Sequence, residues 1–88
     1  MDFEWHSAKE LANRRKHGVD FRTAAKVFLD PYLIEFDHLD AAGELRFNAI
    51  GLVDGRMLFV TYTTRGDVVR IISARGAEPH EKRTYHEI

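Results

Sequence analysis

Arg46 and Arg70 are the residues of this chain whose types and positions point most directly to chemistry. A guanidinium group is planar and carries several N–H donors, so two of them side by side can clamp a phosphate. Asn48 and Thr61 would add uncharged donors next to them. These four residues predict an anion-binding site, provided that the chain folds so that they share one surface.

A purely structural interpretation of the two arginines stays open at this stage. Exposed pairs of arginine and carboxylate are common and say little about function. Carboxylates that could form such pairs occur at Glu35, Asp37 and Glu44. Arg75 is a further arginine at the end of the last expected strand (67–75), but strand alternation places it on the other sheet face or at the edge. It would reach the site only if the chain bends there.

Three residues are candidates for proton transfer. His17 ends a basic stretch, where an imidazolium that caps a helix is the structural interpretation and a general acid or base is the functional one. Glu81 and Tyr85 are four residues apart and share a helix face. Tyr85 either packs in the core or extends its hydroxyl to a polar surface. Trp5 likewise either stacks on a nucleobase or anchors the chain over the core.

Several classes of site lack their usual sequence pattern. The five histidines form no H-x-x-x-H or H-x-H pair, and the chain has no cysteine. We therefore expect no metal centre, no disulfide and no cofactor. The glycine motifs of nucleotide-triphosphate hydrolases, serine hydrolases and dinucleotide oxidoreductases are also missing.

The composition is that of one globular domain. The chain has 88 residues, of which 44% are hydrophobic and 31% charged, so we expect a single domain over residues 1–88. The longest apolar run, Met57 to Val60, is too short to cross a bilayer. The start, Met1 to Glu4, is acidic, unlike a secretory signal. These features predict a cytoplasmic protein without membrane contact.

The N-terminal third has the pattern of two helices. Ser7 and Glu10 fit a capping box, and Gly18 supplies a left-handed stop, which predicts a first helix over residues 7–17. Asp20 can cap a second helix, which should end before the proline of Asp30-Pro31. The spacing of apolar residues is helical up to that point and extended beyond it.

The rest of the chain reads as strands followed by one helix. We expect strands over 32–37, 45–53, 56–64 and 67–75, with hairpin turns at Asp54-Gly55 and Arg65-Gly66. Glu78-Pro79 then opens a last helix that extends to about residue 87. The prediction is an α+β fold with two N-terminal helices, a four-stranded, mainly antiparallel sheet and a C-terminal helix.

Two-residue loops in both hairpins would fix which residues share a face. One face would be almost entirely apolar and would be covered by the two N-terminal helices. It would carry three rows of residues paired across the strands, namely Phe47/Tyr62/Val69, Ala49/Val60/Ile71 and Gly51/Leu58/Ser73. The other face would have an apolar half under the last helix, with Leu52, Met57 and Ala74 and with Ile50, Phe59 and Ile72. Its polar half would hold Asn48, Thr61 and Arg70 and also Arg46, Thr63 and Val68. Alternation thus places Arg46 and Arg70 together.

The chain also resembles the BrnT family of bacterial type II toxins. The matching pieces are Phe3-Glu4-Trp5, Lys9, Asn13, Lys16-His17-Gly18-Val19, Phe21, Ala24-Ala25, Val27-Phe28, Asp30-Pro31, Gly43-Glu44, Arg46-Phe47, Ala49-Ile50-Gly51, Tyr62-Thr63, Arg65-Gly66-Asp67, Arg70-Ile71-Ile72-Ser73-Ala74-Arg75, Ala77, Glu81 and Tyr85. The chain departs from the family pattern at His6, Leu45 and Gly76, where an acid, an acid and a base are usual.

The resemblance implies a function and partners. It implies a RelE-like fold and a ribonuclease that inhibits translation, with RNA as substrate. A BrnA-like antitoxin with a ribbon-helix-helix part would neutralise it in a hetero-oligomer, which would contact operator DNA only through the antitoxin. We expect metal-independent cleavage by the neighbouring 2′-hydroxyl.

Roles for individual residues follow from that reaction. Phosphate stabilisation is assigned to Arg46, Arg70 and Arg75, with Lys16 assisting. Proton transfer is assigned to His17, Glu81 and Tyr85, in no fixed order. Contacts to RNA are assigned to Lys16, Asn48, Thr61 and Trp5.

A second interpretation belongs to a different class of protein. The domain would then be a catalytically silent binding module, which acts as a co-repressor together with a DNA-binding antitoxin. It would use the sheet face that carries Arg46 and Arg70 to bind acidic residues of that partner.

Overall fold

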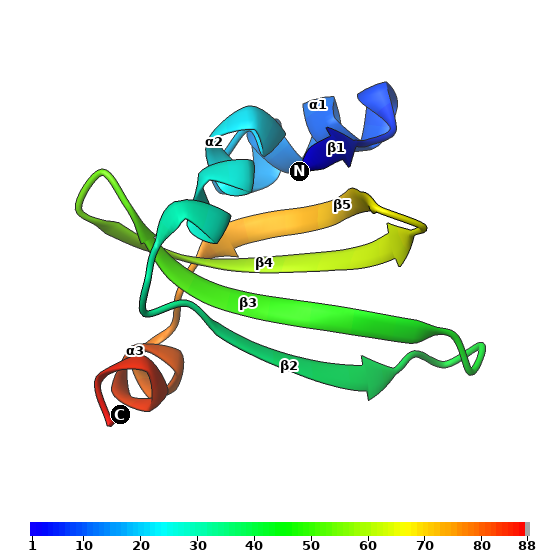
Figure 1. Cartoon of the computed structure of the whole chain (residues 1–88). Coiled ribbons are helices and arrows are strands. Elements are labelled where there is room, and N and C mark those ends of the chain that lie inside the picture. Colours follow the sequence, from blue (N-terminus) through cyan, green and yellow to red (C-terminus); the bar gives the residue numbers. More distant parts are fainter. Residues whose placement is uncertain (88) are drawn as a thin grey trace.

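The computed structural model describes residues 1–87 and confirms the α+β class (Figure 1). Its elements in chain order are β1 (Asp2–Glu4), α1 (Ser7–His17), α2 (Phe21–Ala25), the 3₁₀ helix η1 (Lys26–Leu29), β2 (Ile34–Leu39), β3 (Leu45–Val53), β4 (Arg56–Arg65), β5 (Val68–Gly76) and α3 (Pro79–His86). They form a five-stranded sheet of order β1-β5-β4-β3-β2. All neighbouring strands are antiparallel except β1 and β5. The predicted sheet had four strands and lacked β1.

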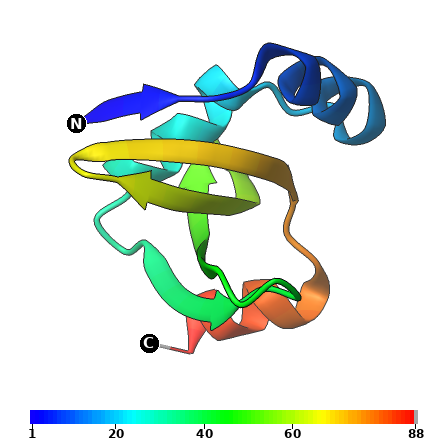
Figure 2. The same ribbon diagram turned by 90° about the vertical axis from the view of Figure 1, so that its right-hand side faces the viewer.

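The sheet lies between two layers of helix. Figure 1 shows α1, α2 and η1 on one side of the sheet and α3 on the other, and the turned view in Figure 2 shows the same separation. The main core lies under the first three helices and includes Phe21, Val60 and Ile71. On the other face, a smaller cluster joins Tyr85 of α3 to Ile50 and Met57 of the sheet. The predicted division of helices between the two faces is therefore confirmed.

The first helix begins differently from the prediction. His6 is the N-cap, and its Nδ1 accepts a hydrogen bond from the Lys9 amide at 3.4 Å. Ser7 is already helical. The Glu10 carboxylate, expected to fold back on the cap, instead accepts a hydrogen bond from the Phe21 amide at 3.3 Å. The predicted Ser7–Glu10 capping box is wrong because Glu10 satisfies the start of the next helix.

The junction between the first two helices follows the prediction. Gly18 ends α1 with a φ of 70°, a left-handed conformation that glycine adopts without strain. Asp20 caps α2, since its Oδ1 accepts a hydrogen bond from the Thr23 amide at 2.7 Å. This hydrogen bond from the Thr23 amide is also the main reason why the pKa of Asp20 is lowered. The second helix tightens to 3₁₀ geometry over Lys26–Leu29 and ends at Asp30.

The two hairpins differ in how well they were predicted. Asp54 and Gly55 both have positive φ, 49° and 83°, and the β3–β4 register is the expected one. The second turn lies at Gly66 and Asp67 instead of Arg65 and Gly66, because Arg65 still pairs with Val68 in the ladder.

A register shift in the β4–β5 ladder changes the second half of β5. Tyr62 pairs with Ile71 but Thr61 pairs with Ser73, so Ile72 is the extra residue of a bulge. Beyond a one-residue bulge every side chain moves to the opposite face. Arg75 consequently lies opposite Phe59, on the α3 side, and the prediction for it was wrong. The predicted positions of Ser73 and Ala74 were wrong for the same reason.

Two separate parts of the chain form hydrogen bonds along the outer edge of β5. β1 pairs with its first part, from Asp2 opposite Val68 to Glu4 opposite Arg70. Further along, the buried Asn13 of α1 takes the place of a strand. Its Nδ2 donates to the Ala74 carbonyl at 2.8 Å, and its Oδ1 accepts from the Ala74 amide at 3.1 Å.

The remaining elements shift only at their ends. β2 covers Ile34–Leu39 instead of 32–37. The last helix begins at Pro79 as predicted and ends at His86, and Glu78 and Glu81 form a capping box at its start. Among the described residues, no helix is long and apolar enough to span a membrane.

Candidate functional site

A cavity of about 230 Å³ lies at the end of the sheet where β4 and β5 meet their turn. We call it the basic pocket, and the polar residues that line it are His6, Lys9, Glu44, Arg46, Thr63, Arg65 and Arg70. Arg46 comes from β3 and Arg70 from β5. Both therefore point to the same side of the sheet, as strand alternation predicted.

Each of the two arginines already has a carboxylate partner. Arg70 Nη1 lies 2.6 Å from Glu4 Oε2. Arg46 Nε lies 3.0 Å from Asp40 Oδ2, and its Nη2 lies 3.6 Å from Glu44 Oε2. Glu44 was among the predicted partners, whereas Asp40 and Glu4 were not. The Glu44 amide and then the Arg46 guanidinium hold the pKa of Asp40 below its ordinary value.

The pocket keeps positive charge beyond these pairs. Lys9 and Arg65 make no ion pair within residues 1–87. Cations grouped in a concave site raise the local concentration of anions. The carboxylates hold the two arginines in place. The arginine side chains therefore lose less conformational entropy when an anion binds. The arrangement can hold a phosphate and stabilise charge that develops on it.

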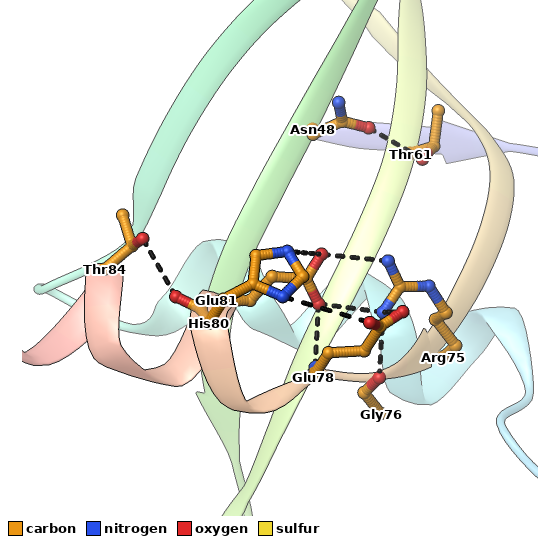
Figure 3. A network of polar contacts seen from close by, with 8 residues as sticks. All are labelled: Asn48, Thr61, Arg75, Gly76, Glu78, His80, Glu81 and Thr84. Carbon is orange, nitrogen blue, oxygen red and sulfur yellow. Dashed lines mark hydrogen bonds and ion pairs between the residues drawn. The ribbon is translucent and has the colours of Figure 1, made fainter.

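A row of neutral polar groups continues along the same face. Thr61 Oγ1 donates to Asn48 Oδ1 at 2.8 Å, and Asn48 Nδ2 lies 3.1 Å from His38 Nδ1. Figure 3 shows the Asn48–Thr61 pair on adjacent strands, further along the sheet than the start of α3. Asn48 is only 8% exposed, and its amide contacts the side chains of Thr61 and His38.

Arg75 and Glu81 form a tight pair at the start of α3 (Figure 3). Nη1 and Nη2 of Arg75 donate to Oε1 and Oε2 of Glu81 at 2.8 and 2.9 Å, and the guanidinium also lies over the Phe59 ring. Burial alone would raise the pKa of Glu81, but the hydrogen bonds from Arg75 and from the Glu78 amide outweigh it and lower the pKa. The hydrogen bond to Glu81 raises the pKa of Arg75.

Tyr85 lies at the opposite end of the face from the basic pocket. Its hydroxyl donates to Asp30 Oδ2 at 2.7 Å, and the same oxygen accepts from the Leu52 amide at 2.8 Å. The bond to Asp30 raises the pKa of Tyr85 to about 12. This position fits the structural alternative for Tyr85, since the bond ties α3 to the chain that precedes β2.

The remaining predicted residues, Lys16, His17 and Trp5, lie on the side of the sheet that α1 and α2 cover. His17 is half-buried and Lys16 exposed at the end of α1. Trp5 packs edge-on against Phe21, with 6.1 Å between ring centroids, as expected for an anchor over the core. The structure thus brings Arg46 and Arg70 into one pocket. It places Asn48, Thr61, Arg75 and Glu81 further along that face, and leaves the other predicted residues away from the pocket.

Sequence reasoning missed His6 and Lys9, which enter the pocket from the start of α1. It also missed Glu4, which holds Arg70 from β1. The alternation of Asp2 and Glu4 with Phe3 and Trp5 is a short strand pattern, and it was the signal that could have placed these residues beside β5.

Fold and pocket together define a small α+β domain with a basic pocket at one end of a sheet face. Residues 1–87 contain no group of three or more histidine and acidic side chains that could hold a metal ion. A family model described as the ribonuclease toxin BrnT of type II toxin–antitoxin systems matches residues 5–81, and the chain belongs to this family. Membership implies an antitoxin partner. A comparison with curated proteins gave no match.

Proposed function

We propose that this chain is an endoribonuclease that cleaves RNA without a metal ion and thereby inhibits translation. The observation that carries the proposal is the convergence of Arg46 and Arg70 on one pocket from two different strands. Family membership supports ribonuclease activity. The pocket supplies the cations that such a reaction needs at the phosphate.

The reaction sets clear demands on the site. Attack by the 2′-hydroxyl forms a bond to phosphorus and breaks the bond from phosphorus to the 5′ oxygen. The phosphate gains negative charge on the way, which fixed cations stabilise better than water does. We assign this role to Arg46 and Arg70, with Lys9 next to them. Arg75 would meet a neighbouring part of the RNA strand, beside Asn48 and Thr61.

Proton transfer needs a base for the 2′-hydroxyl and an acid for the 5′ oxygen. His6 and Glu44 line the basic pocket, and we assign proton transfer to this pair. The predicted candidates His17, Glu81 and Tyr85 lie outside the pocket. Their alanine variants, compared with His6→Ala and Glu44→Gln, show which group the reaction uses.

The decisive experiment incubates purified protein with RNA in excess EDTA. We expect cleavage that leaves 2′,3′-cyclic phosphate ends, and no cleavage at a nucleotide whose 2′-hydroxyl is replaced by hydrogen. Cleavage that requires added Mg²⁺ would contradict the metal independence. Intact RNA under all conditions, with a folded protein, would contradict the activity itself.

We propose a BrnA-like antitoxin as the partner, through which the complex would reach operator DNA. Induced expression should arrest growth and cause RNA decay, and co-expression with the neighbouring gene should prevent both. Operator DNA should bind the complex but not this chain alone. Growth arrest with undiminished RNA would contradict the ribonuclease mechanism.

One observation favours the alternative of a silent binding module. Arg46 and Arg70 already contact carboxylates of this chain, so the same face could grip acidic side chains of a partner. That module would bind the antitoxin tightly and leave RNA intact. Substituting both arginines by alanine would then weaken antitoxin binding and change nothing in RNA.

A further inference from the structure

His38 is an exposed residue that the predicted site did not include. It lies in β2 and pairs in register with Arg46, and Phe36 pairs with Asn48. Directly opposed residues of antiparallel strands share a face, with Cβ atoms about 4.5–5.5 Å apart. The imidazole therefore stands next to the arginine that enters the basic pocket, on the side away from Arg70.

The contacts of the ring define where its proton lies. Asn48 Oδ1 accepts the Thr61 hydroxyl proton, so the Asn48 amide presents its NH₂ group to His38. An NH₂ group can only donate, and His38 Nδ1 must therefore accept. In a neutral imidazole the single proton is then on Nε2. Within residues 1–87 Nε2 has no hydrogen-bond partner.

The Asn48 amide fixes the orientation of the His38 ring. Asn48 is 8% exposed, and both ends of its amide are used, one on Thr61 and one on the ring. A buried amide that is hydrogen-bonded at both its oxygen and its nitrogen holds its partner in one orientation. The Asn48 amide thus directs the Nε2–H donor of His38 toward solvent, on the sheet face that carries Arg46.

We propose that His38 is a substrate-contacting residue, whose Nε2–H donates a hydrogen bond to a phosphate oxygen of RNA held by Arg46. Asn48 is a positioning residue, which acts by keeping the proton on Nε2. The proton stays on the ring throughout, and the hydrogen bond strengthens as the phosphate oxygen gains charge. This inference rests on the proposed ribonuclease function.

The first test reads the tautomer directly and needs no activity. Nitrogen-15 NMR of the imidazole should show the neutral His38 ring protonated on Nε2. In Asn48→Asp a carboxylate replaces the NH₂ group and accepts from Nδ1–H, so the neutral ring should carry its proton on Nδ1. A wild-type ring protonated on Nδ1 overturns the inference.

The second test is kinetic. His38→Ala should lower kcat for RNA cleavage by about 10- to 100-fold, the value of one hydrogen bond to a charged group, with little change in KM. His38→Gln should recover part of the loss, because its side-chain amide can donate. The matched control is His86→Ala, an exposed histidine of α3, which should cleave RNA at the wild-type rate.

The third test is the pH profile of Asn48→Asp. Its neutral ring exposes an acceptor at Nε2, whereas its protonated ring again exposes a donor. The variant should therefore be less active at high pH, where its ring is neutral, than at low pH, whereas the wild type should keep its activity over the same range. A parallel loss at every pH would mean that the substitution only perturbs the fold, and would contradict the positioning role.

Failure of the inference and failure of the proposed function give different results. Wild-type protein that cleaves RNA while His38→Ala cleaves equally fast refutes the role of His38 and leaves the ribonuclease assignment intact. Wild-type protein that leaves RNA intact refutes the function, and with it the proposed contact to the scissile phosphate.

Discussion

Arg46 and Arg70 enter one pocket from opposite sides of β4, each held by a carboxylate from a different part of the chain. Asp40 holds Arg46 from the turn before β3, and Glu4 holds Arg70 from β1. The carboxylates fix the guanidinium groups in place but also compete with any incoming phosphate. This double effect leads to the first prediction.

Glu4→Gln should strengthen RNA binding. The substitution removes a negative charge next to Arg70, and a partly exposed ion pair of this kind is worth about 0.5–1 kcal/mol. We expect the dissociation constant to fall by roughly two- to fivefold at low salt. Fluorescence anisotropy with a 2′-deoxy-substituted RNA measures it, with Glu87→Gln as the control. Weaker binding would show that Glu4 chiefly orients Arg70 for the phosphate.

Asn13→Ala should destabilise the fold. The side chain donates to the carbonyls of Val19 and Ala74 and accepts from the Ala74 amide, and all of these groups are buried. Leaving them without partners should lower the free energy of unfolding by about 2 kcal/mol. Urea denaturation measures the loss, and Arg15→Ala on the exposed face of α1 is the control. An unchanged urea midpoint would mean that water replaces the amide without cost.

Acid should destabilise the protein, in part through Glu81. Its pKa is lowered in the folded state, so the stability it contributes is present above its unfolded pKa of about 4.5 and is lost as pH falls through the folded value. Glu81→Gln should lower the free energy of unfolding at pH 7 by about 2 kcal/mol, and should flatten its dependence on pH below 5. Urea denaturation from pH 7 to pH 3 tests both effects. A variant with the wild-type slope in acid would show that Glu81 does not contribute.

Tyr85→Phe should lower the urea midpoint and leave RNA cleavage close to the wild-type rate. The variant removes the hydrogen bond to Asp30 but keeps the ring in the cluster with Ile50 and Met57. A loss of cleavage in a variant with the wild-type circular dichroism spectrum would instead support the predicted role of Tyr85 in proton transfer.

The parts of the fold that were predicted correctly depend on local chemistry. Gly18 and Asp20 act within their own turns, and Asp54-Gly55 determines the register of its hairpin by itself. Because that register is local, the face carrying Arg46 and Asn48 followed from alternation alone.

The parts that were not predicted depend on contacts between distant segments. The bulge at Ile72 moves Arg75 onto the α3 face, and the Asn13 amide that closes β5 beyond it comes from α1. β1 has only three residues, and its pairing with β5 stabilises it as a strand. His6 and Lys9 reach the basic pocket through that pairing, for which the only sequence signal is the short alternation over residues 2–5.

A double-substitution cycle on Arg46 and Arg70 tests the central claim most directly. Each alanine variant should lower the rate of RNA cleavage by roughly 10²–10³-fold, as loss of a preorganised donor does. Because both side chains act on one phosphate, the double variant should lose less than the product of the two single losses. Arg22→Ala on α2 should cleave as the wild type does. Cleavage at the wild-type rate by the folded double variant would contradict the account.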